Sequence, residues 1–124
     1  MKWDEAPDIT RNIKMLVKGL KFAHVDTSRI VCFRSYGSSA NARARIWSFP
    51  TVWQLALKLP AHYVIEVLSE KFDHLSEDDR MKVLIHELLH IPKNFSGALV
   101  SHKGRYHRID HKRVETLFRE LKEK

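Results

Sequence analysis

Residues 86–90 of the sequence read His-Glu-Leu-Leu-His, which is the H-E-x-x-H pattern. On a helix, two histidines four residues apart lie on one side, so both imidazoles can reach one zinc ion at about 2.0 to 2.1 Å. Glu87 comes three residues before His90 and is placed to reach a water molecule on the metal rather than the metal itself. The pattern therefore predicts that His86 and His90 are metal ligands and that Glu87 is a general base.

These residue types in this order suit the hydrolysis of a peptide bond. A zinc ion lowers the pKa of its water to about 7, and a nearby carboxylate can then remove a proton as the water attacks a carbonyl carbon. Glu87 could later give that proton to the leaving amine. The sequence therefore predicts a zinc-dependent metallopeptidase, a hydrolase in which Glu87 assists the attack of a zinc-bound water.

A third protein ligand has to come from elsewhere in the chain, because a catalytic zinc ion usually takes three protein ligands and keeps its fourth position for water. Pro92 stops the motif helix, and the loop that follows can return to the metal at His102. His102 is therefore the favoured third ligand. The alternatives left open are His107, Asp110, His111 and Glu115.

Two stretches around the motif resemble known groups of proteins. Residues 85–97, Ile-His-Glu-Leu-Leu-His-Ile-Pro-Lys-Asn-Phe-Ser-Gly, resemble uncharacterised metallopeptidases of archaea and their phage relatives, and the likeness covers most of the chain. Residues 102–106, His-Lys-Gly-Arg-Tyr, are similar to the second motif of the SprT-type zincins, which has a His, a nearby Gly and an aromatic residue. The match departs from that motif in placing Lys103 between the histidine and the glycine.

The resemblance implies a minimal zincin-like fold in which His86, His90 and His102 hold zinc and Glu87 is catalytic. It implies no particular substrate. It does not extend to the metzincins, because their pattern would place a glycine at position 93 and a histidine at position 96, where this sequence has lysine and serine.

The helix that carries the motif has clear predicted limits. Ser76 is followed by three acidic residues, which is typical of a helix start, and Pro92 cannot continue a helix. The spacing therefore predicts a helix over residues 76–91. Because apolar residues fill the arc opposite the His-Glu stripe, we expect a buried helix whose polar stripe lines an internal cleft.

Further helices and strands are indicated by the spacing of apolar residues. Helical spacing predicts helices over residues 8–20, with Asp8 or Thr10 as the N-cap, over 51–59 and over 112–122. Short runs rich in β-branched and aromatic residues predict the strands. The predicted strands cover residues 29–35, 42–49 and 63–68.

The order of these segments predicts an α+β fold, with a small mixed sheet packed against an N-terminal helix, the motif helix and a C-terminal helix. No repeat or linker divides the chain, so a single domain over residues 1–124 is expected. The strand at 42–49 could pair with an extended substrate backbone. Glu66 is a lone charge within its strand; it could orient a ligating histidine, and a solvent-facing position is the favoured interpretation.

Composition narrows the type of protein. The chain has 124 residues, of which 44% are hydrophobic, as in an ordinary globular domain. It shows neither a secretory signal nor an apolar run near the roughly 20 residues of a membrane helix, so a cytoplasmic protein without membrane contact is expected. Cys32 is the only cysteine, which excludes an internal disulfide and a thiolate metal cluster and leaves histidine and carboxylate as metal ligands.

The net charge of +7 and the basic residues of segment 103–113 indicate an alternative function. The chain could be a nucleic-acid-associated protein whose zinc site acts on proteins bound to DNA or RNA, or serves structure alone. A module that keeps the motif without catalysis is a third interpretation. In the leading interpretation the partner is a peptide or protein substrate, and the sequence leaves the cleavage preference and the oligomeric state open.

Overall fold

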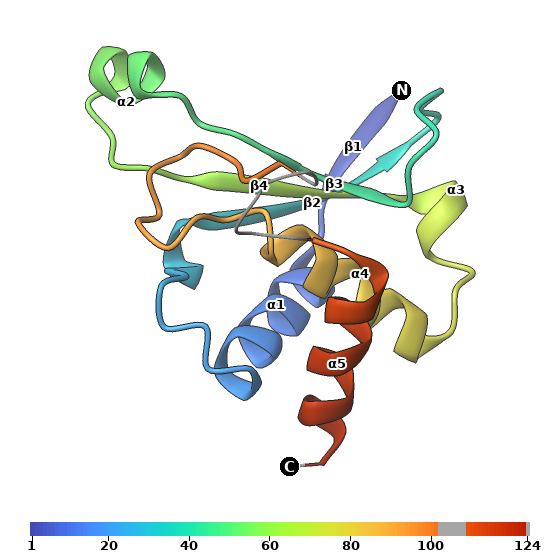
Figure 1. The fold of residues 1–124 in the computed structure, drawn as a ribbon. Coiled ribbons are helices and arrows are strands. Elements are labelled where there is room, and N and C mark those ends of the chain that lie inside the picture. Colours follow the sequence, from blue (N-terminus) through green and yellow to red (C-terminus); the bar gives the residue numbers. More distant parts are fainter. Residues whose placement is uncertain (102–108, 124) are drawn as a thin grey trace.

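The computed structural model describes residues 1–101 and 109–123. Within them, a four-stranded sheet is covered on one face by three helices, α1 (Pro7–Gly19), α4 (Glu77–Leu88) and α5 (His111–Lys122) (Figure 1). This arrangement confirms the predicted α+β class and the packing of a small mixed sheet against the first helix, the motif helix and the last helix. The described helices include none whose length and apolar content would suit a membrane crossing.

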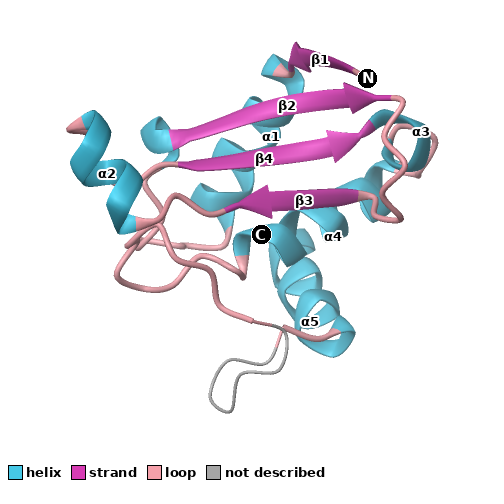
Figure 2. Ribbon diagram, turned by 90° about the horizontal axis from the view of Figure 1, so that it is seen from above, coloured by secondary structure: helices cyan, strands magenta, loops and turns pink. Residues whose placement is uncertain are grey.

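The sheet has the strand order β1-β2-β4-β3 (Figure 2). Its inner strands β2 (Ile30–Tyr36) and β4 (Tyr63–Leu68) run parallel, whereas β1 (Lys2–Glu5) and β3 (Ala44–Trp47) are antiparallel edge strands. β2, β3 and β4 confirm the predicted strands, although β3 is shorter than predicted. The sequence pattern does not indicate β1, because Trp3 is its only apolar residue, nor the short elements η1 (Thr27–Arg29) and α3 (Ser69–Phe72).

The core lies between the sheet and the helices that cover it. α1 buries Ile9, Ile13 and Leu16, which recur at helical spacing as predicted. On the sheet side, Ile65 and Val67 of the central strand β4 are fully buried. Because side chains alternate along a strand, the residues between them point to the opposite face, which no helix covers in Figure 2.

The start of α1 differs from the prediction that Asp8 or Thr10 caps it. The N-cap is Ala6, because Pro7 occupies the first helical position, where its missing N–H is one that the helix would leave unpaired anyway. Asp8 instead lies in the first turn, and its Oδ2 is 2.9 Å from Nη2 of Arg34 in β2. The acidic side chain at this helix start therefore joins α1 to the sheet.

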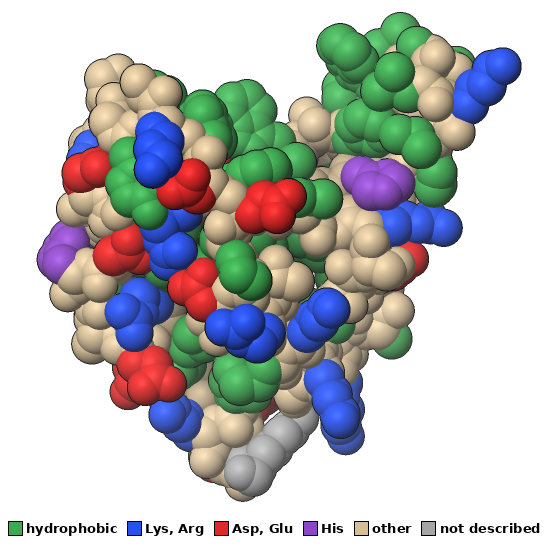
Figure 3. Space-filling model, turned by 180° about the vertical axis from the view of Figure 1, so that it is seen from behind, with side chains coloured by type: hydrophobic (Ala, Val, Ile, Leu, Met, Phe, Trp, Pro, Cys, Tyr) green, Lys and Arg blue, Asp and Glu red, His purple; other side chains and the backbone are tan. Residues whose placement is uncertain are grey.

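α2 (Thr51–Leu57) forms where the sequence predicts a helix at residues 51–59, but none of its residues is buried. Val52, Trp53 and Leu55 are 67%, 55% and 74% exposed. α2 lies in the apolar lobe that projects at the upper right of Figure 3. The apolar face that the sequence indicates for this helix therefore does not pack on the core.

The loop after the motif is fixed by contacts with β4 and with the chain before α2. The N–H of Phe49 donates to the Gly97 carbonyl oxygen at 2.7 Å. Tyr63 Oη donates to the Ala98 carbonyl oxygen and accepts from the Gly97 N–H, both at 2.8 Å. Gln54 Nε2 donates to the Ser96 carbonyl oxygen at 2.8 Å. These bonds hold the loop at the end of the sheet where β4 begins.

Gly97 has no room for a side chain, because its φ is +92° and an added Cβ would clash with the Phe49 carbonyl oxygen. We expect Gly97→Ala to lower the free energy of unfolding by about 3 kcal/mol, from backbone strain and overpacking together. Gly37→Ala is the matched control, since Gly37 has a φ of +79° but its added Cβ would meet no atom closer than 3.7 Å. Urea denaturation should show a loss of about 1 kcal/mol for the control, and equal losses would contradict a role for the Phe49 contact.

Candidate active site

α4 carries His86 and Glu87 and begins where the sequence predicts. Ser76 is its N-cap, and the Ser76 hydroxyl accepts a hydrogen bond from the Asp79 N–H at 3.1 Å. The residues predicted to lie opposite the His-Glu stripe are buried in the core, among them Met81, Leu84, Ile85 and Leu88. The helix start and the buried face of α4 are therefore confirmed.

The end of α4 differs from the prediction. The helix stops at Leu88 rather than at residue 91, so His90 lies just beyond it. The chain tightens there into a 3₁₀ pattern, in which the His90 N–H donates to the Glu87 carbonyl oxygen and the Ile91 N–H donates to that of Leu88, each at 3.1 Å. Pro92 explains the early end, because it disfavours helical angles at Ile91 and has no N–H for the Leu88 carbonyl.

His90 is held by a pair of hydrogen bonds to Val100. The Val100 N–H donates to the His90 carbonyl oxygen at 2.7 Å, and His90 Nδ1 lies 2.6 Å from the Val100 carbonyl oxygen. A carbonyl oxygen can only accept, so Nδ1 carries the hydrogen. In the neutral imidazole Nε2 then keeps its lone pair, which is the arrangement that metal-binding histidines commonly show.

The other two functional side chains of the motif lie beside His90. The His86 and His90 ring centroids are 5.2 Å apart, with the rings inclined at 75°. His86 Nε2 lies 3.9 Å from Oε2 of Glu87. Although His90 is outside the helix, the three side chains predicted from the motif are therefore gathered in one place.

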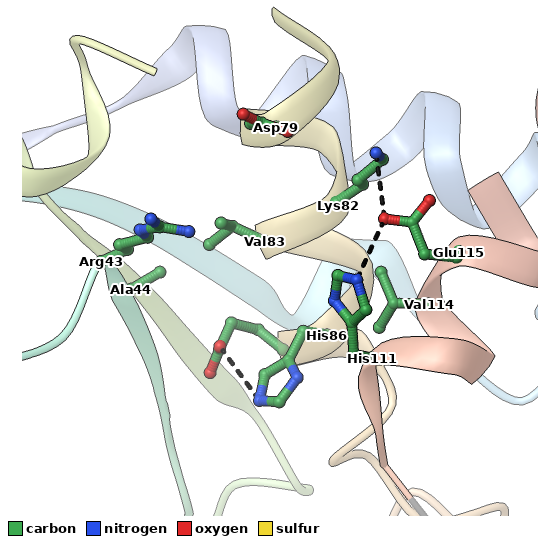
Figure 4. Close-up of a pocket in the computed structure, with 10 residues that line it drawn as sticks. Arg43, Ala44, Asp79, Lys82, Val83, His86, His111, Val114 and Glu115 are labelled. Carbon is green, nitrogen blue, oxygen red and sulfur yellow. Dashed lines mark ion pairs between the residues drawn. The ribbon is translucent and has the colours of Figure 1, made fainter. Parts of the chain in front are cut away.

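A pocket of about 420 Å³ opens beside these residues, between α4, α5 and the start of β3. His86 and Glu87 line it from α4, Arg43 and Ala44 from the sheet edge, and Glu115 from α5. Figure 4 shows His86 and Arg43 entering the pocket from opposite sides. The cleft predicted along the His-Glu stripe is therefore present.

The predicted third ligand, His102, lies outside the described residues, and so does the alternative His107. His111 and Glu115 line the pocket, where Glu115 Oε1 is 3.0 Å from Lys82 Nζ and 3.6 Å from His111 Nε2 (Figure 4). Among residues 1–101 and 109–123, no three His, Cys, Asp or Glu side chains are close enough to hold one metal ion. The described part of the chain thus brings two predicted ligands together, but not a third.

Another alternative ligand, Asp110, has a structural partner. It is the N-cap of α5, and its Oδ1 accepts a hydrogen bond from the Arg113 N–H at 2.8 Å. Such caps stabilise a helix by about 1 kcal/mol. This bond gives Asp110 a role at the start of α5 that requires no metal.

Glu87 is a strongly perturbed titratable group of the site. Its residue is only 7% exposed, and burial raises the pKa of Glu87 to about 8, while a hydrogen bond from the backbone N–H of Ile46 acts in the opposite direction. A carboxyl group that stays protonated to this pH is one whose proton can be exchanged near neutrality. Burial thus brings the pKa of Glu87 into the range in which a carboxyl group can exchange protons near neutrality.

Glu66 does not face the solvent, so the favoured sequence interpretation of this residue is wrong. It is completely buried. Its carboxylate accepts hydrogen bonds from Ser35 Oγ at 2.6 Å, from Arg45 Nε at 2.7 Å and from Trp47 Nε1 at 3.0 Å. The neighbouring strands β2 and β3 therefore supply donors that replace the water around this charge.

Two groups that contact the motif residues are not indicated by the sequence pattern. They are the Val100 carbonyl, which accepts from His90, and the Ile46 N–H, which donates to Glu87. Both are backbone groups, so the identity of the side chain gives no signal. Only the pairing of the edge strand and the return of the loop could have revealed them.

The raised pKa of Glu87 predicts a pH dependence of stability in protein freed of metal by a chelator. Between the ordinary value of 4.5 and about 8, the folded state binds more protons than the unfolded state, so stability falls as the pH rises. We expect Glu87→Gln to remove this part of the decline. Above pH 8 its free energy of unfolding should exceed that of the wild type by a few kcal/mol, at about 1.4 kcal/mol per pKa unit. Urea denaturation from pH 5 to 9 measures it, and parallel curves for the two proteins would contradict the burial of an ionisable Glu87.

Comparison with protein families gives a match over most of the chain. The family model for putative phage metallopeptidases matches residues 1–122. No curated protein and no solved structure matches the chain significantly. The family description indicates a metallopeptidase, a metal-dependent hydrolase that acts on peptides or proteins. Because the match covers nearly the whole sequence, the chain belongs to the putative phage metallopeptidase family.

Proposed function

We propose that this chain is a zinc-dependent metallopeptidase in which Glu87 assists the attack of water on a peptide bond. The observation that carries the proposal is the bond between His90 Nδ1 and the Val100 carbonyl, which puts the hydrogen on Nδ1 and the lone pair on Nε2, the tautomer that suits a metal ligand. His86 lies beside it, with ring centroids 5.2 Å apart. Two imidazoles fit the donor preferences of zinc, and the buried Glu87 beside them is the proposed general base.

The proposed ligands are His86, His90 and His102. Support for His102 comes from the path of the loop, because Val100 is hydrogen-bonded to His90 through both its N–H and its carbonyl oxygen. The chain therefore reaches the site two residues before His102. Glu115 is a weaker candidate, since its carboxylate already forms an ion pair with Lys82.

Glu87 carries the proton transfers of the proposed mechanism. A zinc ion at this site would act as a Lewis acid that lowers the pKa of a water molecule to about 7. Glu87 takes a proton from that water as its oxygen bonds to the carbonyl carbon. It then gives the proton to the amine nitrogen as the C–N bond breaks. The Ile46 N–H orients the Glu87 carboxylate through its hydrogen bond.

The outer edge of β3 is the proposed binding surface for the substrate backbone. β3 is an edge strand, and its residue Ala44 lines the pocket that contains His86 and Glu87. The Leu68 N–H donates to the Arg43 carbonyl oxygen, so by antiparallel alternation Ala44 directs its N–H and C=O away from β4. An extended peptide could pair there as a further strand.

The alternative of a nucleic-acid-associated protein rests on the basic segment 103–113. Residues 103–108 of this segment lie outside the described residues. The described part contributes Lys112 and Arg113 on α5, and these two charges alone do not favour nucleic acid over the peptidase reading. A cytoplasmic location and a single domain over residues 1–124 stay predictions.

Replacing Glu87 tests the proposed chemistry. We expect Glu87→Gln to lower the hydrolysis of a casein or peptide substrate at least about 100-fold, because the amide cannot take up the proton. Zinc content per chain should stay at the wild-type value. Glu77→Gln is the control, an exposed residue at the start of the same helix. Hydrolysis by Glu87→Gln at the wild-type rate would rule out the proposed role.

Zinc analysis of single variants tests the ligand set. After dialysis against a weak chelator, we expect His86→Ala, His90→Ala and His102→Ala each to lose most of the zinc, because two remaining ligands bind it far more weakly than three. His107→Ala and His111→Ala should keep one zinc ion per chain. If His102→Ala keeps its zinc and either His107→Ala or His111→Ala loses it, then the histidine whose replacement removes the zinc is the third ligand and His102 is not.

A further inference from the structure

The edge strand β3 supplies the backbone group that contacts the catalytic carboxylate. The N–H of Ile46 donates a hydrogen bond to Glu87. β3 has four residues and pairs with β4 on one side only. A short edge strand with one neighbour opens more readily than a central strand. The position of Ile46 therefore depends on whatever else fixes β3 to the sheet.

The side chains on either side of Ile46 are fixed from the opposite face of the sheet. Arg45 and Trp47 alternate with Ile46 and therefore point away from α4. Arg45 Nε lies 2.7 Å and Trp47 Nε1 lies 3.0 Å from Oε1 of the buried Glu66 in β4. The Arg45 guanidinium carbon is 4.9 Å from the centroid of a Trp47 ring, so the two also stack on each other.

Glu66 is ionised in this cluster. Burial alone would raise its pKa, but hydrogen bonds from Arg45, Ser35 and Trp47 outweigh burial and hold the pKa of Glu66 below its ordinary value. A buried carboxylate is tolerated only with such partners, since it has lost its water. The attraction between Glu66 and the two β3 side chains is therefore strong and directional.

We propose that Glu66 is a positioning residue, which holds β3 through Arg45 and Trp47 so that the Ile46 N–H meets the Glu87 carboxylate. Glu66 acts through the backbone of β3 from the face of the sheet opposite α4. The catalytic consequence rests on the proposed function, whereas the structural link between Glu66 and Ile46 does not.

A second ion cluster offers a matched control on the other face of the sheet. Arg34 of β2 lies 3.0 Å from Oδ2 of Asp73 and 2.9 Å from Oδ2 of Asp8. This cluster joins α1, β2 and α3, and β2 has no contact with β3 in the sheet order. Asp73→Asn therefore weakens a carboxylate–guanidinium cluster of the same chemistry without touching the edge strand.

The test compares Glu66→Gln with Asp73→Asn in the full chain with zinc added. Hydrogen exchange followed by NMR measures the Ile46 amide beside the amides of Ile13 and Leu16 in α1. We expect Glu66→Gln to speed exchange at Ile46 about tenfold more than at the α1 amides. Asp73→Asn should change the exchange rates of the Ile46 amide and of the α1 amides by the same factor. Equal effects of the two variants at Ile46 would overturn the proposal.

Hydrolysis provides the second measurement. We expect Glu66→Gln to lower kcat about tenfold with KM within about twofold, because a misplaced base affects the transition state and not substrate binding. Asp73→Asn should keep the wild-type kcat. A kcat that falls equally in both variants, as overall destabilisation would cause, argues against positioning.

Trp47→Phe covers the case in which Glu66→Gln does not fold. Trp47 is 46% exposed, and this change removes one donor to Glu66 while keeping a ring over Arg45. The exchange rate of the Ile46 amide should rise, by a smaller factor than in Glu66→Gln. An unchanged exchange rate at Ile46 would contradict the proposal. If the zinc-loaded wild type hydrolyses no substrate, the proposed function is overturned. The positioning role of Glu66 is still tested in that case, because hydrogen exchange at Ile46 is measured independently of hydrolysis.

Discussion

The paired hydrogen bonds between His90 and Val100 are the constraint on which the site depends. They set the tautomer of His90, with the hydrogen on Nδ1 and the lone pair on Nε2, and they return the chain to the motif after Pro92 has ended the helix. The same loop is also held three residues before Val100, where the Gly97 N–H donates to Tyr63 Oη. Without this anchored loop the motif would offer two histidines at the end of a helix and nothing to define the space between them and the sheet.

The two faces of the sheet have separate tasks. The face toward the helices provides the core, whose buried side chains fix α4 and therefore His86. The opposite face carries a charged cluster at Glu66 that fixes the edge strand. Glu87 lies where these two constraints meet, between α4 and Ile46. Its burial costs stability when it ionises, which is a common cost of placing a reactive carboxyl group in a cleft.

Local sequence signals predict the helices and strands well. They fail where the position of a residue depends on partners that are distant in the sequence. Ser76 and the apolar period identify the start and buried face of α4, because caps and periodicity are local. The contact of His90 with Val100, ten residues on, and the burial of Glu66 among donors from other strands depend instead on distant parts of the chain. The exposed apolar face of α2 shows the same limit, since periodicity indicates a helix but not what covers it.

The bonds that hold Val100 against His90 come from the protein alone. Folding therefore supplies the ordering of the loop up to this point, and metal binding does not have to. Ligands that are already in place bind more tightly than ligands that must be ordered on binding, because less conformational entropy is lost. A ligand on α5 would carry an added cost, because Glu115 would first have to leave Lys82. This cost, together with the anchoring of Val100 beside His90, supports the proposal of His102 as the third ligand.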